Sequence, residues 1–151
     1  MSDYNMKAWP KFNEAGDLPP GIHDAKLEEV VHHFGTTSPR RAVLARRLER
    51  IWQLAYSTGH LARFVVFGSF ITAKSEPNDV DIFLLMDDLF DVRTVSPEAR
   101  PVFDHAAAQN LLGASVFWIR RLAALGGEEA AITHWQIKRD GGRRGIVQVA
   151  P

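Results

Sequence analysis

The sequence predicts an α/β fold, because short apolar runs typical of buried strands alternate with longer segments of helical periodicity. The clearest runs lie at 64–67 and 80–86, and the clearest helical segment lies at 39–56. The chain has 151 residues, of which 46% are hydrophobic, so it is long enough for one core. We expect residues 1–24 to form an extended arm and residues 25–151 to form a single domain.

The predicted arm is rich in turn-forming residues, which favour an extended path over the surface: Pro10, Gly16, Pro19, Pro20 and Gly21. A short helix is predicted at 25–34, where apolar residues share one face up to Gly35. The next helix begins with Ser38 as its N-cap and Pro39 at its first position, and it ends near Tyr56.

The central part of the chain continues the alternation of helix and strand after the two apolar runs. A helix is predicted at 96–112, where Ser-Pro-Glu precedes an alanine-rich stretch. A strand follows at 115–119. The alanine-rich segment 120–131 contains two glycines, so we expect a helix that is broken once.

The last part of the chain predicts a β-hairpin. Residues 132–138 and 144–149 alternate between apolar and polar positions on either side of an Asp-Gly-Gly sequence at 140–142. Together with the earlier strands, this hairpin brings the predicted number of strands to five.

Composition excludes several classes of function. Eighteen basic residues balance eighteen acidic ones, so no overall charge draws the chain to nucleic acid or to a membrane. The chain has no cysteine, which excludes disulfides, thiolate zinc sites and cysteine nucleophiles. No apolar run approaches the roughly 18 residues of a membrane span. We therefore expect a cytoplasmic protein that does not bind membranes.

A paired-acid pattern lies between the two clearest strands. Asp79 and Asp81 flank Val80, so on a strand their carboxylates share one face while the valine enters the core. Paired carboxylates repel each other, and this repulsion either raises a pKa or attracts a hard cation such as Mg²⁺. Gly68 and Ser69 follow the first strand and offer a tight turn with N–H groups for a phosphate. This pattern indicates a Mg²⁺-bound triphosphate between the turn and the carboxylates, with in-line attack on phosphorus.

Each of these features also has a purely structural interpretation. The aspartates can be a solvated strand start after Pro77 and Asn78, and the glycine and serine can be an ordinary capped turn. Lys74, in the spacer, can contact a phosphate as a point charge or solvate a loop. Five arginines recur at helical spacing, which favours a solvated face over contact with RNA or nucleotide: Arg40, Arg41, Arg46, Arg47 and Arg50.

The tryptophans show no regular spacing along the chain: Trp9, Trp52, Trp118 and Trp135. We expect them to pack in the core or to dock the arm. Stacking on a nucleobase is the alternative for any one of them.

The paired-acid pattern resembles a known signature. Gly68 and Ser69, nine intervening residues, and the Asp79, Val80, Asp81 triplet are similar to the glycine-serine and aspartate-apolar-aspartate motif of the polymerase β-type nucleotidyltransferase superfamily. The resemblance implies that the turn binds phosphate and that both aspartates are metal ligands and catalytic residues. It further implies Mg²⁺ or Mn²⁺ as cofactor and an NTP such as ATP as substrate.

A wider likeness covers most of the chain. Segments 18–35, 68–83 and 139–149 resemble an uncharacterised family of small bacterial nucleotidyltransferase-like proteins. This resemblance implies a nucleotidyltransferase-like α/β domain over residues 25–151, with a small mixed sheet of about five strands flanked by helices. The expected reaction moves a nucleoside monophosphate onto a hydroxyl of an unknown acceptor, either an RNA or a protein.

The chain departs from the superfamily pattern at the third carboxylate. That acid usually lies on a following strand, but here Ser115 occupies the expected position. Asp87, Asp88 and Asp104 are the candidates to replace it. The departure favours a second hypothesis, in which a weak or inactive nucleotidyltransferase fold binds a protein partner, as components of toxin-antitoxin pairs do. A plain structural domain is the third hypothesis.

Overall fold

The computed structural model describes residues 6–151 and shows an α/β fold with one mixed sheet of five strands and four helices in this part of the chain. The sheet has the order β1-β5-β2-β3-β4. Its strands are β1 (Ile22–Ala25), β2 (Leu61–Phe67), β3 (Asp81–Met86), β4 (Ser115–Arg120) and β5 (Ile146–Val149). The helices are α1 (Leu27–Phe34), α2 (Pro39–Ser57), α3 (His105–Ala107) and α4 (Glu128–Thr133). The α/β class and the mixed five-stranded sheet are therefore confirmed.

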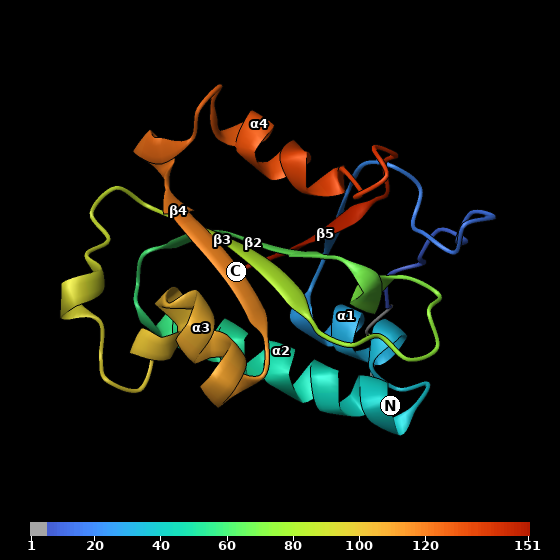
Figure 1. Ribbon diagram of the computed structural model, residues 1–151, viewed down its shortest axis with the longest axis horizontal. Coiled ribbons are helices and arrows are strands. Elements are labelled where there is room, and N and C mark those ends of the chain that lie inside the picture. Colours follow the sequence, from blue (N-terminus) through green and yellow to red (C-terminus); the bar gives the residue numbers. More distant parts are fainter. Residues whose placement is uncertain (1–5) are drawn as a thin grey trace.

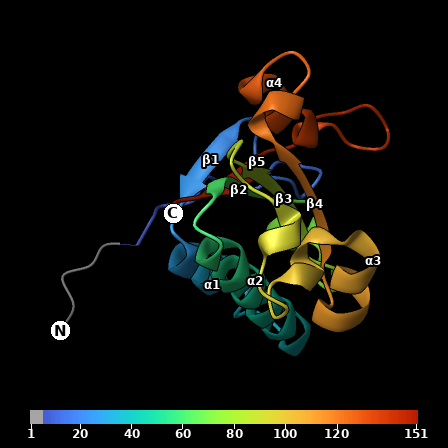
Figure 2. The same ribbon diagram turned by 90° about the vertical axis from the view of Figure 1, so that its left-hand side faces the viewer.

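Helices cover the two faces of the sheet unequally. Helices α1, α2 and α3 lie on one face and α4 lies on the other, as both views show (Figure 1, Figure 2). Neighbouring residues of a strand point to opposite faces, so Phe64 and Val66 join the large core beneath α1 and α2. Val65 and Phe83 join a smaller cluster with Ile132 of α4. The α4 face thus has much less apolar cover, and the candidate site lies on this face.

The two predicted N-terminal helices are confirmed with small shifts of their ends. Ser38 caps α2, because its side chain accepts a hydrogen bond from the Arg41 backbone N–H, and Pro39 occupies the first turn. Helix α1 begins two residues later than predicted, at Leu27, and ends before Gly35.

Two segments of the predicted arm differ from the expectation. Residues 22–24 belong to β1, which pairs in parallel with β5 at the edge of the sheet. Asp17 is buried, so this part of the arm is packed into the molecule rather than laid over it. Trp9 does dock the arm as expected, because its ring stacks on His33 at 4.9 Å between centroids. Residues 1–5 of the predicted arm lie outside the described residues.

The predicted hairpin at the end of the chain is wrong. Residues 128–133 form α4, followed by a 3-10 helix at His134–Gln136, and only a single bridge joins Ile137 to Arg143. Strand β5 instead inserts between β1 and β2, parallel to the first and antiparallel to the second. Strand β5 therefore pairs with a neighbouring strand on each side, whereas the predicted hairpin pairs it with one strand.

The predicted continuous helix at 96–112 is also wrong. A 3-10 helix at Arg100–Phe103 is followed by α3 and then by a π-helix at Ala108–Leu112. Pro101 lacks an N–H and clashes with the preceding turn, so an α-helix cannot run through it. The segment 120–131 is a short 3-10 helix at Arg121–Ala123 and then the start of α4, in line with one break.

No helix among the described residues is long and apolar enough to cross a membrane.

Candidate functional site

A cleft of 680 Å³ lies on the α4 side of the sheet, where β2 ends and where β3 and β4 begin. Every site residue predicted from the sequence lines it, and so does the serine that replaces the expected third acid: Gly68, Ser69, Lys74, Asp79, Asp81 and Ser115. The structure therefore brings the turn, the spacer lysine and the paired acids to one place.

Gly68 sets the position of the Asp81 carboxylate. The last residue of β2, Phe67, is the register partner of Asp81 in β3, so the turn that follows lies directly beside the acid. Gly68 has φ +79° and ψ −163°, a conformation that side chains with a Cβ rarely adopt. A Cβ at this position would stand 2.0 Å from Asp81 Oδ2. Only glycine lets the carboxylate lie against the turn.

Asp81 occupies an environment that opposes its negative charge. Burial, and then the nearby negative charge of Asp79, raise the pKa of Asp81 to about 6, although Arg144 and Arg139 act in the opposite direction. Asp79 lies two residues before Asp81 and lines the same cleft, so the two negative charges oppose each other there. A cation between these carboxylates would relieve that repulsion.

Ser115 occupies the place beside Asp81 in the neighbouring strand. The two residues are register partners in the parallel β3–β4 ladder, and the Ser115 N–H donates to the Val80 carbonyl at 3.0 Å. Ser115 is buried at the floor of the cleft. The serine therefore stands where the resemblance places the third acid.

The other aspartates considered for the third acid do not line this cleft. Asp87 follows the opposite end of β3 and pairs with His60 at 2.9 Å. Asp88 accepts a hydrogen bond from the Leu122 N–H, and Asp104 caps α3. Among the described residues, no group of three or more acidic or histidine side chains could hold a metal ion.

Helix α2 holds the spacer between the turn and the acids. The buried Arg41 guanidinium donates to the carbonyls of Phe70, Thr72 and Lys74 at 2.5, 2.7 and 2.5 Å. The neighbouring Arg40 donates to the Pro77 and Asn78 carbonyls at 3.0 and 2.6 Å. The expectation of a solvated face is wrong for Arg41, which is buried, whereas Arg40 is exposed. Both arginines fix the backbone path that carries Lys74 and Asp79 into the cleft.

The opposite wall of the cleft was missed by the sequence analysis. The loop after α4 contributes Lys138, Arg139, Asp140 and Arg144. The sequence pattern predicted a hairpin turn for this segment, and that prediction gave its basic residues no part in the site. Asp17 of the arm orders this loop, since its buried carboxylate binds Lys138 Nζ at 2.9 Å and approaches an Arg144 guanidinium nitrogen at 3.5 Å.

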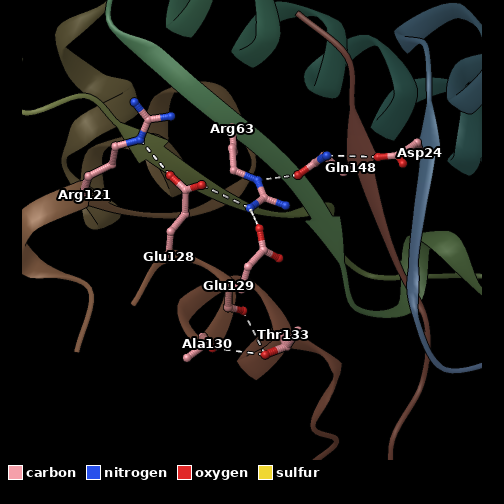
Figure 3. Close-up of polar contacts among 8 residues, drawn as sticks. All are labelled: Asp24, Arg63, Arg121, Glu128, Glu129, Ala130, Thr133 and Gln148. Carbon is pink, nitrogen blue, oxygen red and sulfur yellow. Dashed lines mark hydrogen bonds and ion pairs between the residues drawn. The ribbon is translucent and has the colours of Figure 1, made fainter. Parts of the chain in front are cut away.

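A polar network holds α4 on the sheet (Figure 3). Arg63 of β2 reaches Glu128 and Glu129 at the start of α4, and its Nε donates to Gln148 of β5 at 2.5 Å. Gln148 in turn donates to Asp24 of β1 at 2.9 Å. The network ties three strands to the helix that leads into Trp135 and the basic loop.

The donor set of the cleft fits Mg²⁺ or Mn²⁺. Mg²⁺ keeps several of its waters and is commonly bound through one or two carboxylates together with substrate phosphates. Asp79 and Asp81 supply two carboxylates. Burial, and then repulsion from Asp79, raise the pKa of Asp81, and a cation beside the pair would offset both effects.

The chain matches the family of unknown function DUF6932 over residues 10–150, and it therefore belongs to that family. No curated protein and no solved structure matches the chain.

Proposed function

We propose that this member of the DUF6932 family is a metal-dependent nucleotidyltransferase that moves a nucleoside monophosphate from an NTP onto a hydroxyl of an acceptor. The observation that carries the proposal is the placement of the Asp81 carboxylate against Gly68, with Asp79 lining the same cleft. An acid pair held against a glycine turn fits a metal-bound phosphate. The resemblance to the polymerase β-type superfamily supports the same assignment.

Cationic side chains on two walls of the cleft suit the rest of a triphosphate. Lys74 lines the spacer wall, while Arg139 and Arg144 line the loop wall. Both arginines act electrostatically on Asp81 and lower its pKa, against the larger opposing effects of burial and Asp79. Ser69 begins a 3-10 helix at the turn and adds a hydroxyl and a backbone N–H. We assign these groups to the phosphate chain, with Asp79 and Asp81 holding the metal.

The proposed reaction is a displacement at the α-phosphorus. A bond forms between the acceptor oxygen and the α-phosphorus, the bond from that phosphorus to the bridging oxygen breaks, pyrophosphate leaves, and the hydroxyl proton passes to water. A bound Mg²⁺ would supply positive charge to the phosphoryl oxygens. The chain's own contribution is to orient the triphosphate between the turn and the basic loop and to hold its charge.

A second candidate function is nucleotide binding without transfer, in a protein that acts on a partner. The position of Ser115 beside Asp81 favours it, because this place in the ladder has a hydroxyl where the resemblance implies a third carboxylate. A missing third acid weakens deprotonation of the acceptor more than it weakens nucleotide binding.

Calorimetry with an ATP analogue that carries a methylene between its α and β phosphates tests the binding step. We expect the wild type to bind the analogue only with Mg²⁺ present, and the Asp79→Asn, Asp81→Asn double variant to lose that binding. Glu14→Gln, at an exposed acidic residue of the arm, is the control and should bind like the wild type. Absence of Mg²⁺-dependent binding in the wild type, with this analogue and with its CTP counterpart, would overturn the proposal.

Release of pyrophosphate separates the two candidate functions. A transferase releases it from ATP or CTP in the presence of a competent acceptor, and Asp81→Asn should abolish that release. If the wild type binds nucleotide but releases no pyrophosphate, Ser115→Asp is the next variant. Gain of release in that variant favours an enzyme that lost its third acid, and no gain favours the binding protein.

A further inference from the structure

Three aromatic side chains form one surface inside the cleft. Phe67 of β2, Phe117 of β4 and Trp135 after α4 all line it. The Trp135 ring lies 4.4 Å from Phe67 and 5.3 Å from Phe117 between centroids, with interplanar angles of 33° and 32°. We call these three residues the aromatic shelf. The rings pack against one another, and together they form one apolar wall of the cleft.

The shelf is partly open to solvent. Phe117 is 39% exposed although it lies on a strand, and Ile137, which lines the same cleft, is 51% exposed. The small cluster beneath α4 buries Phe83 in the middle of the sheet, and Ile119 of the edge strand β4 packs against it, but Phe117 of β4 stays partly exposed. Exposed apolar rings beside a charged cleft cost free energy in the unliganded protein, so they indicate a surface that a ligand covers.

The shelf begins beside the acid pair, because Phe67 is the register partner of Asp81, and Phe117 lies further along the sheet. Phe117 follows Ser115 by two residues on the same face of β4, and Ser115 is the register partner of Asp81. Two residues along a strand span about 7 Å. That separation lets a ribose bridge phosphates near the acids and a base on the rings.

We infer that the aromatic shelf receives the nucleobase of the nucleotide by stacking. The inference rests on the proposed function, since the acid pair and the basic loop identify the ligand as a nucleotide. Every base has a π-face, so stacking on apolar rings tolerates any base. The larger rings of purines cover more of the shelf, and we expect purine nucleotides to bind more tightly than pyrimidine nucleotides.

The test compares two ligands on one variant. In the presence of Mg²⁺, the methylene analogue of ATP carries both a base and a triphosphate, whereas inorganic tripolyphosphate carries the phosphates alone. Phe117→Ala should weaken binding of the analogue roughly 5- to 150-fold, the range expected for loss of one base stack. Binding of tripolyphosphate should stay unchanged. Phe117→Tyr keeps the ring and should restore binding of the analogue.

Tyr56→Ala is the control variant, because Tyr56 is an exposed aromatic residue on α2 that does not line the cleft. It should bind both ligands like the wild type. Unchanged binding of the analogue by Phe117→Ala would overturn the inference that the aromatic shelf receives the base, but it would leave the proposed function standing. Equal weakening of both ligands would also overturn it, because Phe117 would then act through the shape of the cleft. If the wild type binds neither ligand, the proposed function itself is overturned.

Discussion

Asp17 and Lys138 are 121 residues apart in the sequence, yet the Asp17 carboxylate accepts a hydrogen bond from Lys138 Nζ at 2.9 Å inside the molecule. The neighbouring backbone of Gly16 accepts a hydrogen bond from the Ala73 N–H at 2.8 Å. The arm thus contacts both walls of the cleft, the spacer at Ala73 and the basic loop at Lys138. Its position helps to set the width of the site.

Replacing Asp17 tests this connection. Asp17→Asn removes a buried charge that faces two cations, Lys138 and Arg144, so we expect the free energy of unfolding to fall by about 1–3 kcal/mol. Urea denaturation measures the change. Glu14→Gln is the matched control, because Glu14 is an exposed acidic residue of the same arm, and the substitution should cost less than about 0.5 kcal/mol. Equal effects of the two variants would contradict a structural role for the buried ion pair.

Alanine substitutions at Gly68 and at Gly59 separate the cost of backbone strain from the cost of steric contact with Asp81. Both have positive φ, but a Cβ at Gly59 meets nothing within 4 Å, whereas one at Gly68 meets the Asp81 carboxylate. We expect Gly59→Ala to cost about 1–2 kcal/mol of stability. Gly68→Ala should cost more and should also abolish Mg²⁺-dependent binding of the ATP analogue. If Gly68→Ala binds the analogue normally, the close packing of turn and carboxylate is not needed for the site.

Substitution of Arg41 should lower the stability of the protein more than substitution at most other positions of α2. Its guanidinium donates to several buried carbonyls, and Arg41→Ala leaves those carbonyls without their donor. We expect a loss of about 3–5 kcal/mol in the free energy of unfolding, measured by urea denaturation. Arg41→Lys should recover only a small part, because an ammonium cannot reproduce the planar fork. Arg46→Ala, at an exposed position of the same helix, should be nearly neutral.

The raised pKa of Asp81 makes the stability of the ligand-free protein depend on pH. The folded protein binds the Asp81 proton with a pKa of about 6, compared with 3.8 for the ordinary side chain. Folding is therefore favoured where this proton is bound, and the contribution of Asp81 to stability falls as the pH rises from about 4 to about 6. The fall amounts to about 3 kcal/mol at most.

Asp81→Asn isolates this effect. The variant lacks the titrating group, so its free energy of unfolding should be nearly the same as that of the wild type at pH 4. At pH 7 the variant should be more stable than the wild type by about 2–3 kcal/mol. Denaturation curves at both pH values give the difference. A wild type that is more stable than the variant at pH 7 would show that Arg139 and Arg144 outweigh burial. A carboxylate that lowers stability yet lines a cleft is typical of a functional group.

The sequence was informative wherever the signal was local. The turn at Gly68, the spacer and the acid pair lie within 14 residues of one another along β2, the spacer and β3, so two adjacent strands were enough to place them together. The helix at 39–56 was equally clear, because a serine cap, a proline and a regular apolar stripe agree.

The missed features depend on contacts between distant segments. Nothing near Asp17 in the sequence points to Lys138, and the buried role of Arg41 depends on a loop some 30 residues away. In the predicted hairpin, alternating residues after Ile132 fitted a strand as well as a helix. The outcome was decided by packing of Ile132, on α4, against the sheet and by pairing of β5 with β1 and β2.

The sheet order has a consequence for how the protein reaches its native state. Strand β5 lies between β1 and β2, and β1 pairs with β5 alone in the sheet. A nascent chain can form α2 and the β2–β3 pair early, but β1 must wait until residues 146–149 have left the ribosome. Until then, the edge of β2 stays open to other chains. We expect slow, late completion of the sheet, and sensitivity to truncations or fusions that hinder β5 more than to changes at the arm's first residues.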